Sequence, residues 1–493
     1  MLFSSSVFIF LFLPISFFVY FLLNHKRFIY AGKCWLVACS IFFYGYWDAS
    51  YIPLLISSIL FNFMAGKTAS PFAYTSLSQK VKKTILFIAI VTNLALLCYY
   101  KYTNFLIENI NNLTSYDLTF KTIILPLGIS FYTFTQIAFL VDSYKGLAKE
   151  YDFVNYALFV TFFPHLIAGP ILHHKEMMSQ FKSKWTLSVR YRNIFMGLFI
   201  FSIGLFKKVV IADSFASFAN LGFSPSAEHD FFSAWATSLS YTFQLYFDFS
   251  GYCDMAIGAA LLFNIWLPLN FNSPYKSFDI QDFWRRWHIT LGRYLRDYIY
   301  IPLGGSRCSQ TRVYINLFFT FVLGGLWHGA SWMFIIWGAM HGGALMIHRL
   351  WKQCGFSMPK PVAWIVTFMF VNVAWVFFRA QSLDEALKIL KGMVDLGSVN
   401  TLTIAQVPSD SLAWGGTFID HLLTILPVGL VSNILSFSLI FIGFIITPMK
   451  NAYELTIGHH SRLLKSAWMT ILFTSAVYTT IQSTSTVFLY FNF

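Results

Sequence analysis

The sequence predicts an all-α polytopic membrane protein, and its composition is the first reason. Of its 493 residues, 57% are hydrophobic and 20% aromatic, whereas 11% are charged. That charged share is less than half of what soluble domains carry. A water-soluble protein of this composition would lack the polar side chains needed to cover its surface. Apolar runs of helix-spanning length recur along the chain, and the strand-period alternation typical of outer-membrane barrels is absent.

The first five predicted spans are separated by loops of alternating charge. They cover residues 5–23, 28–47, 51–66, 84–100 and 122–141. The loops at 24–28, 67–83 and 145–149 are basic, and the loops between them are near neutral. Because cytoplasmic loops carry an excess of Lys and Arg, this bias predicts an extracytoplasmic N-terminus. The first span has no basic region before it and no small-residue cleavage site, so we expect it to be retained.

The middle of the chain is less regular. Residues 153–172 are apolar but interrupted by Pro164, Gly169 and Pro170, and a Lys/Arg cluster follows at 175–192. A full crossing would place that cluster outside, so a re-entrant segment is predicted, a backbone that membranes tolerate when protein surrounds it. Further hydrophobic pieces lie at 195–206, 234–249, 255–267, 313–327, 332–347, 362–378, 434–447 and 467–482. The total predicted is about eleven spans plus one or two re-entrant segments.

These pieces are predicted to form one membrane-embedded domain over residues 1–493. Residues 1–150 hold the N-terminal spans, and 151–380 form a core with re-entrant segments. Residues 381–493 hold a short amphipathic helix at 384–393, an extracytoplasmic loop and the last spans. No internal repeat is detectable, so the inverted-repeat pattern of many transporters is lacking.

The net charge of +13 lies mainly between apolar spans. It therefore indicates positive-inside anchoring and contact with anionic lipid heads of the bilayer, not nucleic-acid binding. A basic cytoplasmic face also attracts anionic cosubstrates. The six cysteines are scattered singly. They form neither a disulfide framework nor a metal-binding spacing, so no metal site is expected.

The most polar stretch of the core, residues 275–307, is predicted as one helix. An apolar stripe follows helical spacing in Phe283, Trp287, Leu291, Tyr294 and Tyr298. Opposite charges four residues apart form the pairs Asp282/Arg286 and Arg293/Asp297. A third face of the predicted helix holds Arg285, His288, Gly292 and Arg296. Two guanidinium groups flanking an imidazole suit an anionic, phosphate-bearing acyl carrier. The alternative is an amphipathic helix on the membrane surface.

His328 closes the apolar run that begins at 316 and has Gly324, Gly325 and Gly329 around it. A charged group at bilayer depth costs roughly 2.5–3.5 kcal/mol on insertion scales. A neutral imidazole avoids part of this cost and is a general base near physiological pH. The glycines allow close approach of backbone or ligand, and Trp327 is placed to wall a pocket. The alternative is a hydrogen-bonded core histidine.

Other polar residues in apolar surroundings are predicted to be structural. Asp248 and Asp254 are expected to be paired, since buried carboxylates usually have partners. The arginines of 275–307 are possible partners, and orientation of a histidine by one carboxylate is the alternative. His165 lies in the broken segment and is predicted to be structural. His341 and His348 are predicted to support the 328 site or an interface.

Several blocks in this order resemble the membrane-bound O-acyltransferase (MBOAT) family. They include Phe-Pro-His-Leu-Ile-Ala-Gly-Pro at 163–170, Phe-Trp-Arg-Arg-Trp-His at 283–288 and Gly-Gly-Leu-Trp-His-Gly at 324–329. Further blocks lie at 125–134, 246–258, 270–275, 296–305 and 374–380. The chain is similar above all to the AlgI-like alginate O-acetyltransferase branch, and more distantly to the DltB-like D-alanyl transfer proteins. One departure from the family pattern is Cys253, where a serine is common.

The resemblance implies a helical shell around a central tunnel, with His328 as the essential histidine at its neck and His288 as the second histidine. It implies a multi-pass protein of the cytoplasmic (inner) membrane. Acetyl-CoA is then the expected donor substrate, no cofactor is permanently bound, and an extracytoplasmic SGNH-type acetyltransferase partner passes the acetyl group to a polysaccharide. Arg285 and Arg296 are hypothesised to bind the phosphates of the acyl-CoA.

Three alternatives remain at this point. The first is a transporter or flippase of a lipid-linked or acyl-bearing substrate, in which the histidines and arginines line a pathway. The second is D-alanyl transfer of the DltB type. The third is a structural scaffold of an export complex. The acceptor is also open among alginate, cellulose, peptidoglycan, lipopolysaccharide and other glycans.

Overall fold

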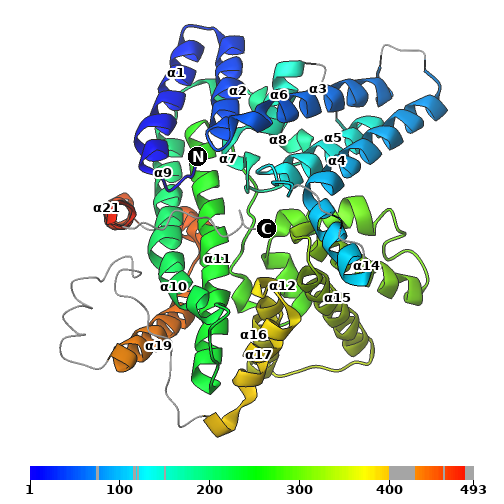
Figure 1. Cartoon of the computed structure of the whole chain (residues 1–493). Helices are drawn as coiled ribbons and strands as arrows, with labels where there is room; N and C mark the ends of the chain where they lie inside the picture. Colours follow the sequence, from blue (N-terminus) through cyan, green and yellow to red (C-terminus); the bar gives the residue numbers. More distant parts are fainter. Residues whose placement is uncertain are drawn as a thin grey trace. The chain divides into compact units, whose positions relative to one another are not determined.

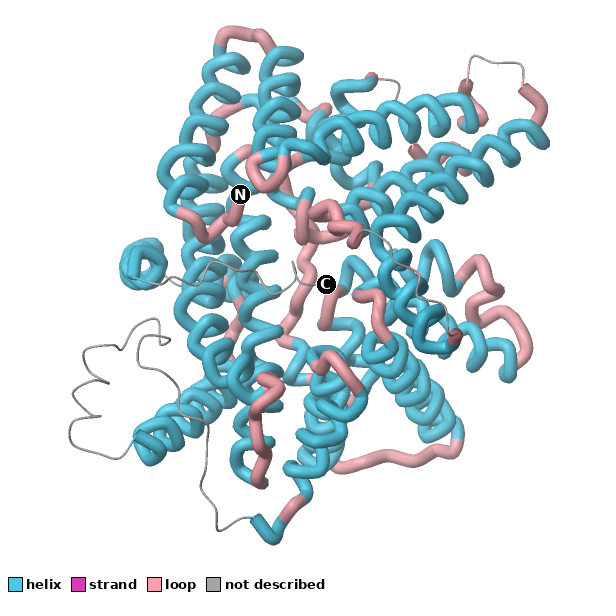
Figure 2. The backbone as a smooth tube through the Cα atoms, viewed as in Figure 1, coloured by secondary structure: helices cyan, strands magenta, loops and turns pink. Residues whose placement is uncertain are grey.

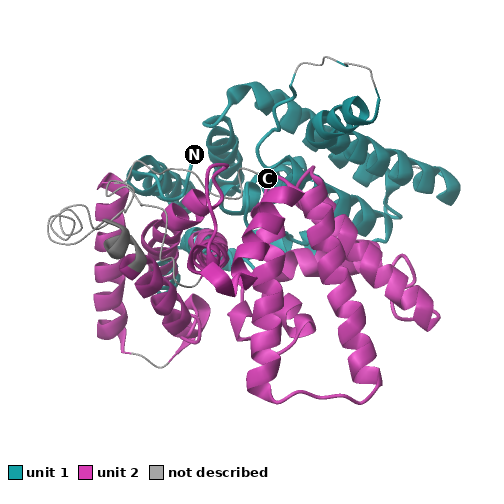
Figure 3. Cartoon of the chain, turned by 60° about the horizontal axis from the view of Figure 1, so that its bottom comes forward, with its two compact units in different colours: residues 1–198, 256–268 teal, residues 199–255, 269–493 magenta. Residues whose placement is uncertain are grey.

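The computed structural model describes residues 1–73, 77–114, 118, 122–148, 152–398, 428–458 and 461–482. Within these ranges every regular element is a helix and none is a strand (Figure 2). The predicted all-α class is therefore confirmed. The chain divides into two compact units, which Figure 3 colours separately. Unit 1 is Met1–Leu198 with Ala256–Pro268, and unit 2 is Phe199–Met255 with Leu269–Phe493.

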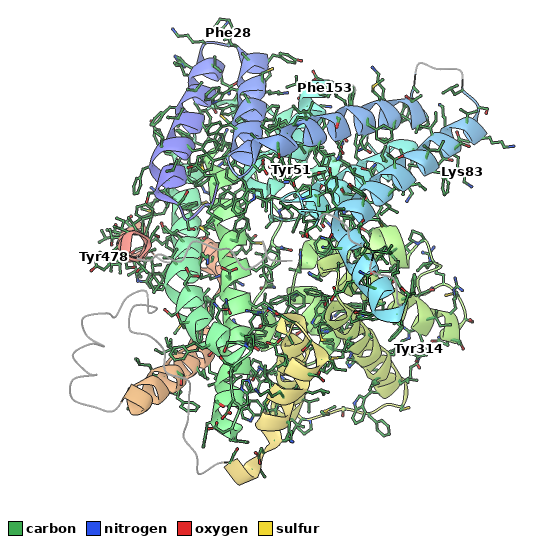
Figure 4. The ribbon with its side chains drawn as sticks, in the orientation of Figure 1. Phe28, Tyr51, Lys83, Phe153, Tyr314 and Tyr478 are labelled. Atoms are coloured by element: carbon green, nitrogen blue, oxygen red, sulfur yellow. The ribbon has the colours of Figure 1, made fainter. Side chains whose placement is uncertain are left out.

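Unit 1 is built from helices of very different length (Figure 1). They are α1 (Leu13–His25), α2 (Ile29–Gly45), α3 (Ile52–Ala69), α4 (Gln79–Leu113), α5 (Ile129–Tyr144), α6 (Phe153–Thr161), α7 (Phe163–Leu166), α8 (His174–Phe181) and the first half of α9 (Tyr191–Phe206). A π-helical turn, Phe8–Phe12, precedes α1. Helices α1 and α2 form an antiparallel hairpin, and Figure 4 labels Phe28 at its turn.

The segment 153–172 is interrupted as its prolines and glycine predict. Helix α6 ends at Thr161, and α7 is a single turn with Pro164 near its start. All residues from Asn155 to Leu172 are buried. The broken backbone is thus surrounded by protein, which is the condition under which a membrane tolerates it. Its re-entrant path stays a prediction.

Unit 2 contains the remaining helices. In order they are a π-helical segment η4 (Lys207–Ala212), α10 (Asp213–Gly222), α11 (Phe231–Leu262), α12 (Ile280–Arg286), α13 (Ile289–Leu295), η6 (Arg296–Tyr300), α14 (Gln310–His328), α15 (Trp332–Gln353), α16 (Lys360–Arg379), α17 (Leu383–Val394), α19 (Val428–Ile446), α20 (Ala452–Ile457) and α21 (Arg462–Gln482). The last turns of α11 belong to unit 1. The amphipathic helix predicted at 384–393 is confirmed as α17, whose inner face buries Ala386, Ile389 and Met393. Most of the loop predicted after it lies outside the described residues.

Five helical stretches of the described chain are long and apolar enough to cross a membrane. They are Phe8–His25, Ala49–Ala69, Gln79–Leu113, Tyr191–Gly222 and Lys360–Arg379. Two shorter apolar helices are Ile29–Gly45 and Ile434–Ile446. The number of about eleven spans stays a prediction, as do the central tunnel, the domain subdivision and the side on which the N-terminus lies.

The buried carboxylates are paired, but their partners are lysines. Lys207 Nζ lies 2.7 Å from Asp254 Oδ2. Lys208 Nζ lies 2.6 Å from Asp213 Oδ1 and 3.0 Å from Asp248 Oδ1. The expected pairing role is therefore confirmed, whereas arginine as the partner is wrong. The two lysines open η4, where the wider π-helical turn interrupts the regular helix.

Two glycines bring the backbones beside these ion pairs close together. A Cβ atom on Gly204 would lie 2.6 Å from the carbonyl oxygen of Gly251, and one on Gly251 would lie 2.8 Å from that of Gly204. Both positions thus exclude larger side chains. Small residues of this kind let membrane helices approach closely. The close approach brings the lysines of η4 within reach of the carboxylates on α11.

Candidate functional site

His328 is the last residue of α14, and the turn 329–331 leads into α15. The Ser331 side chain caps α15 by accepting a hydrogen bond from the backbone N–H of Met333. A Cβ on Gly325 would lie 2.2 Å from the carbonyl oxygen of Phe334, and one on Gly338 would lie 2.4 Å from that of Phe321. Gly325 therefore serves the close packing of α14 against α15.

Aromatic rings surround the His328 imidazole, which is 4% exposed. Its ring centroid lies 5.0 Å from that of Trp327, 5.1 Å from Trp337 and 5.2 Å from Phe378. Trp337 comes from α15 and Phe378 from α16, so three helices contribute to the enclosure. Trp327 belongs to this cluster, and its role as the wall of a pocket stays a prediction.

His288 lies beside His328, with 6.4 Å between the two ring centroids. It is fully buried, and its ring packs edge-on against Phe249 at 4.9 Å. The sequence-predicted pair of histidines is therefore brought together, although 40 positions separate them in the numbering. Two imidazoles in an apolar enclosure can hold and move a proton where water is scarce.

The prediction of one continuous helix over 275–307 is wrong. Helix α12 ends at Arg286, and α13 begins at Ile289. His288 between them has a positive φ of 42°, a left-handed conformation that costs non-glycine residues about 1–3 kcal/mol. The backbone N–H of Ile289 donates to the carbonyl of Asn270, which stabilises this break from outside the segment. Such strain is typical of residues that a fold positions for a task.

Asn270 holds His288 in place. Its Oδ1 accepts hydrogen bonds from the backbone N–H of Thr290 at 3.2 Å and from the Thr290 hydroxyl at 2.9 Å. The same oxygen lies 3.1 Å from His288 Nδ1. A backbone N–H can only donate, so the Asn270 atom that Thr290 contacts must be the amide oxygen. An amide oxygen can only accept, so His288 Nδ1 must carry the proton of the hydrogen bond between them. In the neutral ring, Nε2 then has the lone pair.

The environment of His288 also favours the neutral ring. The residue lies between two helices of seven residues, outside the helices that are long enough to cross a membrane. Burial lowers the pKa of His288 to about 3. The amide of Asn270 donates to Cys253 Sγ at 3.4 Å, so the cysteine that departs from the family pattern contacts the residue that positions the histidine.

The break changes the expected arrangement of charges. The Asp282/Arg286 pair forms at 3.0 Å, as predicted. Arg285 is exposed, and the side chain of Arg296 is 61% exposed and donates to Asp297 at 2.7 Å. Since His288 is buried and lies outside both helices, the predicted helical line of two guanidinium groups around its imidazole is wrong. Their role in binding phosphates stays a prediction.

A second aromatic cluster adjoins the histidine pair. His341 is fully buried and accepts a hydrogen bond at Nδ1 from the indole N–H of Trp284, at 3.2 Å. The Trp337 ring lies 4.7 Å from His341 and stacks on Trp375 at 5.6 Å. Trp337 contacts both His328 and His341, so it joins the two clusters. The supporting role of His341 stays a prediction.

The residues that sequence reasoning missed are Asn270, Trp337 and Phe378. Asn270 begins the block 270–275 and Phe378 lies in the block 374–380, both of which carried the family resemblance. Their place in those blocks was the available signal. Nothing in the local pattern indicates that an amide and two aromatic side chains from different elements meet at one pair of imidazoles.

Comparisons with known proteins identify the family of this chain. A family model described as MBOAT, membrane-bound O-acyltransferase family, matches residues 41–383. A peptidoglycan O-acetyltransferase of Helicobacter pylori is 45% identical over 527 residues, covering 100% of this chain and 98% of the relative. A probable alginate O-acetylase AlgI of Pseudomonas aeruginosa is 40% identical over 407 residues, covering 81% and 76%.

A teichoic acid D-alanyltransferase of Bacillus subtilis is 27% identical over 271 residues, covering 52% of this chain and 69% of the relative. The predicted order of resemblance, with D-alanyl transfer proteins more distant than alginate O-acetylases, is confirmed. The family model covers more than half of the chain, including Asn270, His288 and His328. The chain belongs to the membrane-bound O-acyltransferase family and is a multi-pass membrane O-acyltransferase.

Proposed function

We propose that this enzyme takes an acetyl group from acetyl-CoA on the cytoplasmic side and passes it across the inner membrane for O-acetylation of an extracytoplasmic polysaccharide. The observation that carries the proposal is the enclosed pair His288 and His328, with 6.4 Å between ring centroids. The relatives named as O-acetyltransferase and O-acetylase support an acetyl group. Peptidoglycan is the preferred acceptor, because the relative named for it matches over 98% of its own length.

In the proposed reaction, the His328 imidazole removes the proton of an acceptor hydroxyl. The hydroxyl oxygen attacks the thioester carbonyl, the carbon–sulfur bond breaks, and coenzyme A leaves as a thiol after taking the proton from the imidazolium. His288, whose Nδ1 is held by Asn270, stays neutral and presents the Nε2 lone pair as a hydrogen-bond acceptor. The aromatic walls keep water away and so limit hydrolysis of the thioester.

The donor and the partner are part of the proposal. Arg285 is exposed, as a group that meets coenzyme A phosphates must be, and Arg296 offers a second guanidinium group beside Asp297. Arginine suits phosphate because its planar fork gives two parallel hydrogen bonds. An extracytoplasmic SGNH-type partner would receive the acetyl group and complete its transfer to the glycan.

The test is release of free coenzyme A from acetyl-CoA by the purified protein, with and without the partner. We expect release that depends on an acceptor hydroxyl, supplied either by the partner or by muropeptides. Alginate oligosaccharides are the second acceptor to be tested in the same assay, since one relative is named as a probable alginate O-acetylase. Transport of a substrate without any use of acetyl-CoA would contradict the proposal, and so would full function after loss of both histidines.

Asn270 is expected to be a positioning residue for His288. Asn270→Leu removes the oxygen that holds Nδ1, so kcat should fall about a hundredfold while KM for acetyl-CoA changes little. Asn270→Asp keeps an oxygen acceptor but adds a negative charge, which favours the imidazolium. Its activity should exceed that of Asn270→Leu, and the acid limb of its rate–pH profile should move to higher pH. If both variants kept the wild-type kcat and the wild-type pH profile, Asn270 would not position His288.

A further inference from the structure

An apolar groove is lined by residues of α15 and α16. Its volume is ≈ 630 Å³. Ile347 and Trp351 of α15, Val366 and Phe370 of α16, and Phe356 of the connecting loop supply its apolar surface. The loop, residues 354–359, joins the end of α15 to the start of α16 (Figure 1).

Small residues leave this groove open. Gly343 and Ala344 of α15 and Ala363 of α16 line it. A Cβ atom on Gly343 would meet nothing within 4 Å, so this glycine faces free space, unlike Gly325 and Gly338. Phe370 also lines the groove, and its ring lies 5.3 Å from that of His341. The groove thus borders the aromatic cluster beside the histidine pair.

The outer end of the groove is charged. Lys352 and Lys360 line it from the two helices, together with Asp279 and His348. Lys352 Nζ lies 3.8 Å from Asp279 Oδ2, and the lysine side chain is 56% exposed. The lining holds two lysines and one carboxylate, so the groove mouth carries an excess of positive charge.

Exposed apolar side chains stand beside these lysines. Phe356 is 59% exposed and Met358 is 39% exposed, and the Trp351 ring packs against Phe356 at 4.9 Å. Aromatic and basic residues side by side are typical of the level of lipid head groups. The mouth of the groove therefore has the chemistry of a membrane interface, and the apolar part leads away from it between the helices.

We propose that this groove binds one anionic phospholipid. Its phosphate group lies between Lys352 and Lys360, and an acyl chain fills the apolar groove as far as Phe370. Basic pockets between membrane helices hold anionic head groups, and burial of an acyl chain in an apolar groove adds the hydrophobic contribution. A zwitterionic lipid offers the same chains, but its own ammonium group cancels the attraction to the two lysines. The inference does not depend on the proposed acetyl transfer.

The test uses delipidated full-length protein and native mass spectrometry, with phosphatidylglycerol and phosphatidylethanolamine as probes. Wild type should bind phosphatidylglycerol more tightly than phosphatidylethanolamine. The Lys352→Gln/Lys360→Gln double variant should bind phosphatidylglycerol roughly thirtyfold more weakly, since each surface lysine contributes about fivefold. Its affinity for phosphatidylethanolamine should not change. Gly343→Phe places a ring in the free space and should lower the affinity for both lipids.

Lys391→Gln on α17 is the matched control, because this lysine is exposed and does not line the groove. It should keep the wild-type preference. The two single lysine variants provide a second measurement, each expected to lose about fivefold in affinity for phosphatidylglycerol. Equal affinity of wild type for the two lipids would overturn the proposal. So would an undiminished preference in the double variant, or complete displacement of the lipid by millimolar inorganic phosphate.

Discussion

Replacing His328 with alanine is expected to lower acetyl transfer roughly 10²–10⁴-fold, the usual contribution of a general base. The imidazole is 4% exposed, lies in an aromatic enclosure and is 6.4 Å from the His288 ring. Water in such a site is scarce, so solvent cannot replace the lost base. The measurement is the initial rate of coenzyme A release in membranes of matched protein content.

Two further variants separate chemistry from packing. His328→Gln keeps a polar side chain of similar length but has no basic ring nitrogen, so its activity should stay as low as that of His328→Ala. His25→Ala is the control, because His25 is an exposed histidine at the end of α1. It should retain the wild-type rate. Full acetyl transfer by His328→Ala would contradict the assignment of the base.

Lys208→Met is expected to cost about 3–5 kcal/mol of stability, since removing one partner of a buried ion pair leaves uncompensated charge. Lys208 binds both Asp213 and Asp248 and is 6% exposed in its side chain. Methionine keeps the unbranched apolar stem but brings no positive charge, so the two carboxylates lose their shared cation. The midpoint of unfolding in mixed micelles should fall clearly.

The carboxylates themselves provide the control for this prediction. Lys208→Met/Asp213→Asn/Asp248→Asn removes the negative charges together with the positive one and should recover much of the lost stability. Lys391→Met changes an exposed lysine and should leave the free energy of unfolding within about 0.5 kcal/mol of wild type. If Lys208→Met unfolds at the wild-type midpoint, the ion pairs contribute little to the fold.

Local patterns in the sequence predicted several features correctly. Apolar composition predicted a helical membrane protein, because unpaired backbone groups cannot stay in lipid. Pro164 and Gly169 predicted the interruption of 153–172, since proline lacks the N–H that a continuous helix needs. The Asp282/Arg286 pair formed because residues four apart meet on any helix. Each of these features depends on residues that are close in the chain.

Features that depend on distant residues needed the tertiary structure. The helix predicted through 275–307 breaks at His288 because Asn270, 18 positions earlier, binds the backbone and side chains on the far side of the break. Likewise, Asp248 met Lys208 because Gly204 and Gly251 allow two backbones to approach.

The sequence by itself determined the class of the fold and the family, and it singled out His288 and His328 as candidate site residues. Only the tertiary structure decided that these histidines lie together, that Asn270 sets the proton of one of them, and that Arg285 and Arg296 stay exposed. The physical reason is that helix periodicity specifies neighbours within a few turns. A hydrogen bond or close backbone contact between distant segments has no such periodic signal, and here such contacts override the periodicity at His288.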